Sequence, residues 1–103
     1  MPRDLTGLPI VDYETLTGSG SAQSLTKAKY DRVPPAVGAI VTVDTAPIMW
    51  TADGATAPTA SVGNFMIPTG DPVILMGPNL SRFQFINFGA TNAKVRVHYV
   101  GAG

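Results

Sequence analysis

Glycine and proline interrupt this chain so regularly that no long element fits between them. Eleven glycines and nine prolines are spread over its 103 residues, and the runs between them, about 8 to 12 residues apart, are rich in β-branched and aromatic side chains. The nearest approach to a helical period, SAQSLTKAKYDRV, has too few large apolar residues to dock as a helix, and Pro34 and Pro35 end it. We therefore predict an all-β fold. Residues 1–103 are expected to form a single-domain, jelly-roll-like β-sandwich of about seven or eight antiparallel strands.

The clearest predicted strand is KVRVHYV, residues 94–100, in which apolar and polar side chains alternate with a period of two. In the run before it, RFQFINF (82–88), the first two phenylalanines share one face, but Ile86 and Phe88 fall on the other. That change of phase predicts a β-bulge or a strand buried on both sides. Since only the turn-rich GATNA (89–93) separates the two runs, we expect them to form an antiparallel hairpin.

The other strands are predicted from shorter apolar runs between turn residues. These runs are residues 8–16, 38–44, 47–51, 63–67 and 71–77. Two of them, GAIVTVD and DPVILMG, are dense enough in apolar side chains to be interior strands. Large aromatic side chains are expected to dominate the core, namely Phe65, Phe83, Phe85, Phe88 and Tyr99. The single tryptophan, Trp50, shares the strand parity of Ile48 and is expected to close one end of that core.

Two segments have the composition of exposed chain. Residues 17–26, TGSGSAQSLT, are rich in glycine and serine, which predicts a flexible loop. Residues 1–8 are interpreted as an N-terminal arm, and their charges and proline break the apolar core that a cleaved signal peptide requires. The longest apolar runs fall far short of the ~20 residues that a membrane helix needs.

The surface of this chain is poor in charge. Charged residues make up 14% of the sequence, against about 25% in an ordinary soluble domain, which suggests that another chain covers part of the surface. Seven acidic and seven basic residues cancel and neither sign clusters, so the basic stripe of a nucleic-acid-binding protein is missing. The chain has no cysteine, which excludes disulfides and cysteine–metal sites.

Side chains able to do chemistry are few, and none has the neighbours it would need. His98 lies on the polar side of an alternating strand and is interpreted as a solvated histidine. Asp44, Asp53 and Asp71 fall at strand ends, without the close spacing of a loop-type calcium site. The single glutamate, Glu14, lies in the N-terminal segment, so a glycosidase-type carboxylate pair is not indicated. We therefore expect no enzyme activity, no metal and no cofactor.

Residues 53–62 have the composition of a contact loop. They begin with the turn signal Asp53-Gly54, and no later side chain is larger than valine. Small side chains let a backbone approach another surface closely, and Pro58 limits the entropy lost on docking. Contacts with another protein are predicted in this loop and in the N-terminal arm, which extends to Leu8. The predicted contact residues are Arg3, Asp4, Leu5, Asp53, Gly54, Pro58, Thr59 and Ser61.

A carbohydrate-binding sandwich is the alternative that the residues leave open. Such modules stack sugars on exposed aromatic side chains, for which Trp50 and Tyr30 are the candidates. The hydrogen-bonding groups would then be Asp53, Asn64 or Gln84.

One long stretch combines an aromatic residue and threonine, Asp-Gly, Pro-Thr-Ala, a glycine, an apolar pair, a Gly-Asp turn and an apolar strand: MWTADGATAPTASVGNFMIPTGDPVIL. The run FINFGATNAKVRVHYV follows, with a small-residue turn and an alternating strand. In these stretches the chain resembles small virion-associated structural proteins of tailed bacteriophages, of the head decoration or cement type. The matching positions are Trp50, Thr51, Asp53, Gly54, Pro58, Thr59, Ala60, Gly63, Gly70 and Val97–Tyr99. Residues 1–40 have no counterpart in this pattern.

The resemblance implies a non-enzymatic protein of the virion, which is assembled in the host cytoplasm. A decoration protein binds and stabilises the assembled head shell, usually as a homotrimer, with the major capsid protein or other virion proteins as partners. A tail, fibre or adaptor component is the alternative role. Because the resemblance is to a scaffold of turns and strands, it assigns no catalytic or ligand-binding residue. Contact with nucleic acid or membrane is not expected.

Overall fold

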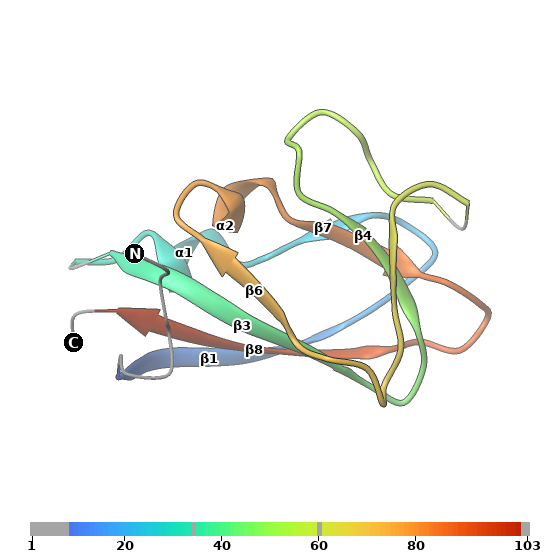
Figure 1. Ribbon diagram of the computed structural model, residues 1–103, viewed down its shortest axis with the longest axis horizontal. Coiled ribbons are helices and arrows are strands. Elements are labelled where there is room, and N and C mark those ends of the chain that lie inside the picture. Colours follow the sequence, from blue (N-terminus) through green and yellow to red (C-terminus); the bar gives the residue numbers. More distant parts are fainter. Residues whose placement is uncertain (1–8, 34, 60, 102–103) are drawn as a thin grey trace.

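The chain folds into two antiparallel sheets that pack face to face. The structure is a computed structural model, and it describes residues 9–33, 35–59 and 61–101. The predicted all-β sandwich is confirmed, with four strands in each sheet. In Figure 1, β4 and β7 lie above β1, β3 and β8. The strands are β1 (Ile10–Thr17), β2 (Gln23–Ser24), β3 (Ala36–Asp44), β4 (Ile48–Thr51), β5 (Asn64–Met66), β6 (Val73–Met76), β7 (Gln84–Asn87) and β8 (Lys94–Gly101).

Sheet A has the strand order β1-β8-β3-β6, so the first and last strands are neighbours. β8 pairs with β1 on one side and β3 on the other, and its Val97 lies between Glu14 and Val41 in the register. Val95, Val97 and Tyr99 are fully buried, while the polar side chains between them are exposed. The alternation predicted for this strand is therefore confirmed.

Sheet B has the strand order β2-β7-β4-β5. Ile48 of β4 is fully buried, and Trp50 has the same parity and lies opposite Phe85. Trp50 is half-buried and packs against the core, with its ring centroid 5.6 Å from that of Phe83. The expected position of Trp50 beside the core is confirmed.

The core fills the space between the sheets. Its buried members are Leu25, Ala39, Val41, Val43, Ala46, Ile48, Met66, Leu75, Leu80, Phe83, Phe85, Ala93, Val95, Val97 and Tyr99. Burial of apolar surface is worth about 25 cal/mol per Å². The fully buried rings of Phe83, Phe85 and Tyr99 therefore contribute most per residue.

The predicted hairpin of the last two strands is wrong. β7 belongs to sheet B and β8 to sheet A, so the segment between them crosses from one sheet to the other. The buried Asn87 holds this crossing: its Oδ1 accepts a hydrogen bond from the amide of Ala93 at 3.1 Å, and its Nδ2 donates to Oδ1 of Asn92 at 2.8 Å. A short connector permits a hairpin but does not require one, because the apolar face that each strand must bury decides its partner.

The bulge predicted in β7 is also wrong, and β7 is not buried on both sides. β7 pairs with β4 from Gln84 to Asn87 without a register shift. The sequence changes phase because a polar residue, Asn87, takes an inward position, while Ile86 and Phe88 have the outward parity. Phe88 is 44% exposed and Phe65 is 54% exposed, so the prediction that both lie in the core is wrong.

β6 is an edge strand and not the interior strand that its apolar sequence predicts. It pairs only with β3, and its Ile74 is 54% exposed. β3, by contrast, is interior as predicted, because β8 and β6 lie on either side of it. An apolar run by itself does not show whether its strand lies inside a sheet or at its edge, because the strands that pair with it lie elsewhere in the sequence.

The connecting segments contain two single-turn helices, α1 (Lys27–Tyr30) and α2 (Asn79–Arg82). Among the described residues, no helix is both long and apolar enough to cross a membrane. The glycine- and serine-rich segment 17–26 contains β2 and the buried Leu25. It is tied to sheet B because the carbonyl of Ser19 accepts a hydrogen bond from the amide of Asn87 at 3.1 Å.

We expect Phe85→Ala to lower the free energy of unfolding by about 3–5 kcal/mol, because the ring is fully buried between the sheets and its removal leaves a cavity. Urea unfolding followed by tryptophan fluorescence measures the change. Val33→Ala is the control: Val33 is 97% exposed, so its stability should stay within about 0.5 kcal/mol of the wild type. Equal effects of the two substitutions would contradict the packing between the sheets.

Candidate functional site

The β4–β5 loop, residues 52–63, extends beyond the body of the sandwich (Figure 1). Its first half is held by its own hydrogen bonds. Oδ1 of Asp53 accepts bonds from the amides of Thr56 at 2.8 Å and Ala55 at 2.9 Å, and the Thr51 hydroxyl donates to the carbonyl of Thr56 at 2.6 Å. The amides of Thr56 and Ala55 lower the pKa of Asp53 from 3.8 to about 2. The first part of the loop, residues 53–56, is therefore held in a defined turn.

The second half of the loop is anchored by its backbone. Thr59 and Val62 exchange backbone hydrogen bonds of 2.9 and 3.3 Å, and Pro58 is buried. Gly63, where the chain enters β5, has a φ of +125°, and a Cβ at this position would lie 2.8 Å from the carbonyl oxygen of Trp50. Only glycine combines this backbone conformation with so close an approach.

The predicted contact residues fall into three groups: exposed, buried, and outside the described residues. The exposed ones, all in the β4–β5 loop, are Asp53, Gly54, Thr59 and Ser61. Pro58 is buried, so it anchors the loop and does not present its ring to a partner. The predicted contacts of the N-terminal arm lie outside the described residues; they are Arg3, Asp4 and Leu5.

The outer surface of sheet A, called face A below, carries a row of side chains across all four strands. The successive partners in the register, from β1 to β6, are Tyr13, His98, Ile40 and Ile74. Tyr13 is 67% exposed, and Ile10 at the start of β1 is 58% exposed. The outer face of a solvated antiparallel sheet is normally polar, so this half of face A is unusually apolar.

The other half of face A is charged. Lys94 and Arg96 follow each other on the exposed side of β8. The guanidinium of Arg96 lies 3.2 Å from the carboxylate of Asp44 on β3. Both side chains are more than half exposed, so this pair contributes little to stability. Face A thus combines an apolar half with a charged half.

The outer surface of sheet B, called face B below, carries an apolar row, and its strands hold no charged residue. The register places Phe65 of β5, Met49 of β4 and Ile86 of β7 in one row. Phe88, directly after β7, packs edge-on against Phe65, with ring centroids 4.8 Å apart and planes at 72°. The strands of this sheet contain no Asp, Glu, Lys, Arg or His. Within the row Phe65 is exposed, Ile86 is half-buried and Met49 is buried, so Phe65 and Phe88 are the aromatic side chains that face B presents to solvent.

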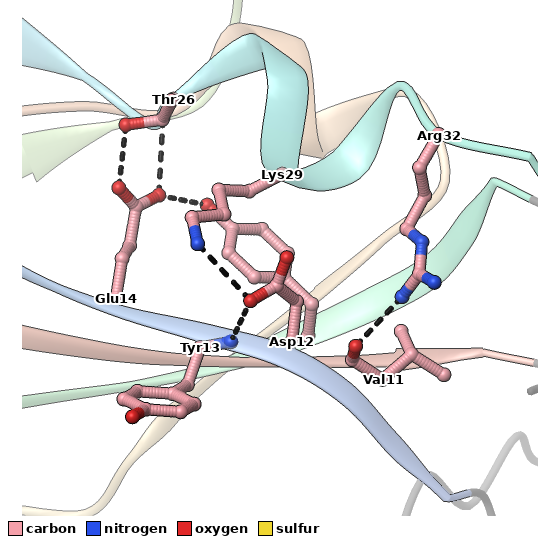
Figure 2. Close-up of polar contacts among 8 residues, drawn as sticks. Val11, Asp12, Tyr13, Glu14, Thr26, Lys29 and Arg32 are labelled. Carbon is pink, nitrogen blue, oxygen red and sulfur yellow. Dashed lines mark hydrogen bonds and ion pairs between the residues drawn. The ribbon is translucent and has the colours of Figure 1, made fainter.

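A polar cluster joins β1 to the segment that contains α1 (Figure 2). The carboxylate of Glu14 accepts hydrogen bonds from the amide and hydroxyl of Thr26 and from the hydroxyl of Tyr99. Burial, and then the hydrogen bond to Glu14, raise the pKa of Tyr99. Nζ of Lys29 lies 3.1 Å from the carboxylate of Asp12.

A further bond of this cluster joins the same two segments: Arg32 donates to the carbonyl of Val11 at 2.7 Å (Figure 2). The carboxylates of the cluster already accept hydrogen bonds from this chain. One of these bonds, from the amide of Tyr13 to Asp12, lies within β1, and the others join β1 to another segment or to β8. We therefore interpret the cluster as a structural tie between β1 and residues 26–32.

The residues considered for catalysis and metal binding are separated in the structure. His98 is exposed on face A, Asp53 is held in its turn, and Asp71 is exposed. In the described part of the chain, no three His, Cys, Asp or Glu side chains approach closely enough to hold a metal ion. Nor does a pocket open in the surface of these residues.

The two aromatic residues considered for sugar binding both pack inward. Trp50 lies against Phe83, and the ring of Tyr30 lies 6.5 Å from that of Tyr99. Both are half-buried. Of the proposed hydrogen-bonding groups, Asn64 and Asp53 are exposed and Gln84 is half-buried. The exposed aromatic side chains are instead those of faces A and B.

Comparison with known proteins adds no assignment, because no family model, no curated protein and no solved structure matches the chain.

The exposed aromatic and aliphatic residues of faces A and B are not identified by the sequence reasoning. A signal for Tyr13 is present, since it shares its strand parity with Thr15 and Thr17. Phe88 likewise shares its parity with Gln84 and opposes that of the buried Phe85. Parity identifies these two residues as exposed only once it is known which side of each strand faces the core.

We expect Gly63→Ala to destabilise the protein by about 1–3 kcal/mol, because a side chain is strained at this positive φ and its Cβ would press on the carbonyl of Trp50. Gly20→Ala is the control, since a Cβ there meets no atom within 4 Å. Thermal unfolding of both variants by circular dichroism measures the difference. A Gly63→Ala variant as stable as Gly20→Ala would show that the loop does not have this backbone.

Protonation of the Asp53 carboxylate at low pH should loosen the turn at the start of the β4–β5 loop. Its folded-state pKa of about 2 lies below the ordinary 3.8, so the carboxylate stabilises the folded state above that ordinary value. This contribution is lost as the pH falls through about 2. NMR titration should give a midpoint near pH 2 for the Asp53 carboxyl and for the Thr56 amide, and Asp53→Asn should remove the amide response. A midpoint near 3.8 would contradict the turn.

Proposed function

We propose that this chain is a non-enzymatic structural protein of a bacteriophage particle, and that it acts as a capsid decoration protein on the assembled head shell. One observation carries the proposal: large apolar side chains are exposed on the outer surfaces of both sheets, where a solvated sandwich presents polar ones. Exposed apolar patches of this kind mark contacts with other proteins. The resemblance of the C-terminal half to small virion proteins supplies the setting.

The proposed action is stabilisation by mass action. A protein that binds only the assembled lattice stabilises it by RT ln(1 + [L]/Kd) at each site, or about 2.7 kcal/mol at a free concentration of 100 Kd. Because a shell repeats the same site many times, a modest contact is multiplied, and copies joined to each other bind with higher avidity. This action requires a fitting surface and no reactive group.

We assign the shell contact to face A. The apolar members of its row supply area to bury, while Lys94, Arg96 and Asp44 beside them select a partner of complementary charge. This combination suits a contact with a different protein, for which the major capsid protein is the proposed partner. The predicted contacts of the N-terminal arm precede β1 in the chain, and β1 is an edge strand of the same sheet.

We expect the double variant Tyr13→Ser/Ile74→Ser to bind head shells about tenfold more weakly than the wild type, a loss of ~1.4 kcal/mol for two exposed apolar side chains. Cosedimentation with shells that lack the protein measures the dissociation constant. Val33→Ser is the matched control, since Val33 is exposed outside both sheets and its removal should leave binding unchanged.

Two results would overturn this proposal. If the double variant binds like the wild type, face A is not the shell contact. If shells without the protein assemble and resist heating as well as decorated ones, the chain is not a decoration protein. Cross-linking of virions followed by mass spectrometry should join the chain to the major capsid protein, and cross-links to tail proteins alone would replace the head by a tail, fibre or adaptor role.

A further inference from the structure

We infer that copies of this chain contact each other through face B, with the β4–β5 loop at the rim of the contact. The occupant of face B is therefore a second copy of the same chain. This inference rests on the proposed function, in which many joined copies bind one shell, and it adds the surface through which the copies are joined.

Face B holds exposed aromatic side chains in a defined arrangement. Phe65 and Phe88 are 54% and 44% exposed although their rings pack edge-on against each other. Ile67, which has the strand parity of Phe65, is also exposed. A partner seated on this face would remove their apolar area from water, which is the main favourable term in most protein–protein association. Rings already held by each other lose little freedom when the contact forms.

The distribution of charge selects a second copy as the occupant. Around a two-fold or three-fold axis, residues near the axis meet their own copies, so a charged residue there faces a like charge. The strands of sheet B contain no charged residue, and face B can therefore meet itself without repulsion. Face A differs, because Lys94 and Arg96 outnumber Asp44 there, and a contact of this face with its own copy would bring together an excess of positive charge.

The edge of sheet B is a second observation in favour of the same occupant. β5 is the last strand of this sheet and pairs only with β4. Its residues, Asn64–Met66, include neither the charge nor the proline that commonly protects an exposed edge strand. A copy packed over face B covers Phe65 on this strand and shields the edge beside it.

The size of a stable interface brings the β4–β5 loop into the contact. A standard interface buries about 800 Å² of each partner's surface. One face of a molecule with extents of 38 × 27 × 27 Å has an area of the same order. The loop joins β4 to β5 at the end of face B, so a contact of this size includes it. Its exposed predicted contacts are Asp53, Gly54, Thr59 and Ser61.

Sedimentation velocity of the purified full chain over a concentration series tests the inference. We expect the wild type to form an oligomer, and Phe65→Ser/Phe88→Ser to raise its dissociation constant about 100-fold. Tyr13→Ser/Ile74→Ser is the matched control, because it removes two large side chains from face A that are at least as exposed and should leave the oligomer intact. A wild type that stays monomeric at every concentration, or a control that dissociates as far as the face B variant, overturns the inference.

Cross-linking gives a readout that does not depend on how well the serine variants fold. The natural chain has no cysteine, so Ile67→Cys introduces a single thiol beside Phe65. A short bismaleimide should join two copies of this variant within the oligomer, whereas Thr15→Cys on face A should stay unlinked. Linkage at position 15 without linkage at position 67 overturns the contact through face B.

The two proposals fail separately. Sedimentation and cross-linking contain no shells, and cosedimentation with shells does not require an oligomer. A monomer that still binds shells overturns the contact through face B and leaves the decoration role. An oligomer that dissociates through face B but never binds shells supports the contact between copies and overturns the decoration role.

Discussion

The packing of β8 between β1 and β3 is the interaction on which the rest of the sandwich depends. Backbone pairing on both sides makes β8 the strand that joins the first strand of the chain to the rest of sheet A. Its inner side supplies Val95, Val97 and Tyr99, all fully buried, to the core. Tyr99 also donates its hydroxyl to Glu14 and packs near Tyr30, so one residue links the core to the polar tie of β1.

The core between the sheets is complete without the outer faces. Sheet A contributes mainly small β-branched side chains, and these pack against the larger rings of Phe83 and Phe85 on the side of sheet B. Such complementary volumes fill an interior to the density that proteins require. Phe65 and Phe88 are left outside this arrangement, in contact with each other. The charged residues of the strands all belong to sheet A, so the two outer faces differ in chemistry and suit different partners.

Much of this fold is visible in local patterns. The alternation of residues 94–100, the shared parity of Ile48 and Trp50, and the turn signal at Asp53-Gly54 each depend on residues a few positions apart, and all three are found as expected. The patterns are weaker where a strand is short or where its buried position is polar. Phe65 lies in a strand of three residues, and Phe88 has the outward parity because the polar Asn87 takes the inward position before it.

The sequence by itself determined the class of fold, the approximate positions of the strands and the small-residue loop, since spacing, alternation and turn residues act over short stretches of chain. Only the tertiary structure decided that β7 and β8 lie in different sheets, that β6 is an edge, and which side of each strand faces water. Faces A and B exist only once strands distant in the sequence lie side by side. The reason is physical: an apolar side chain gains the same free energy in a core or beneath a partner, and only the arrangement of its neighbours decides which of the two will cover it.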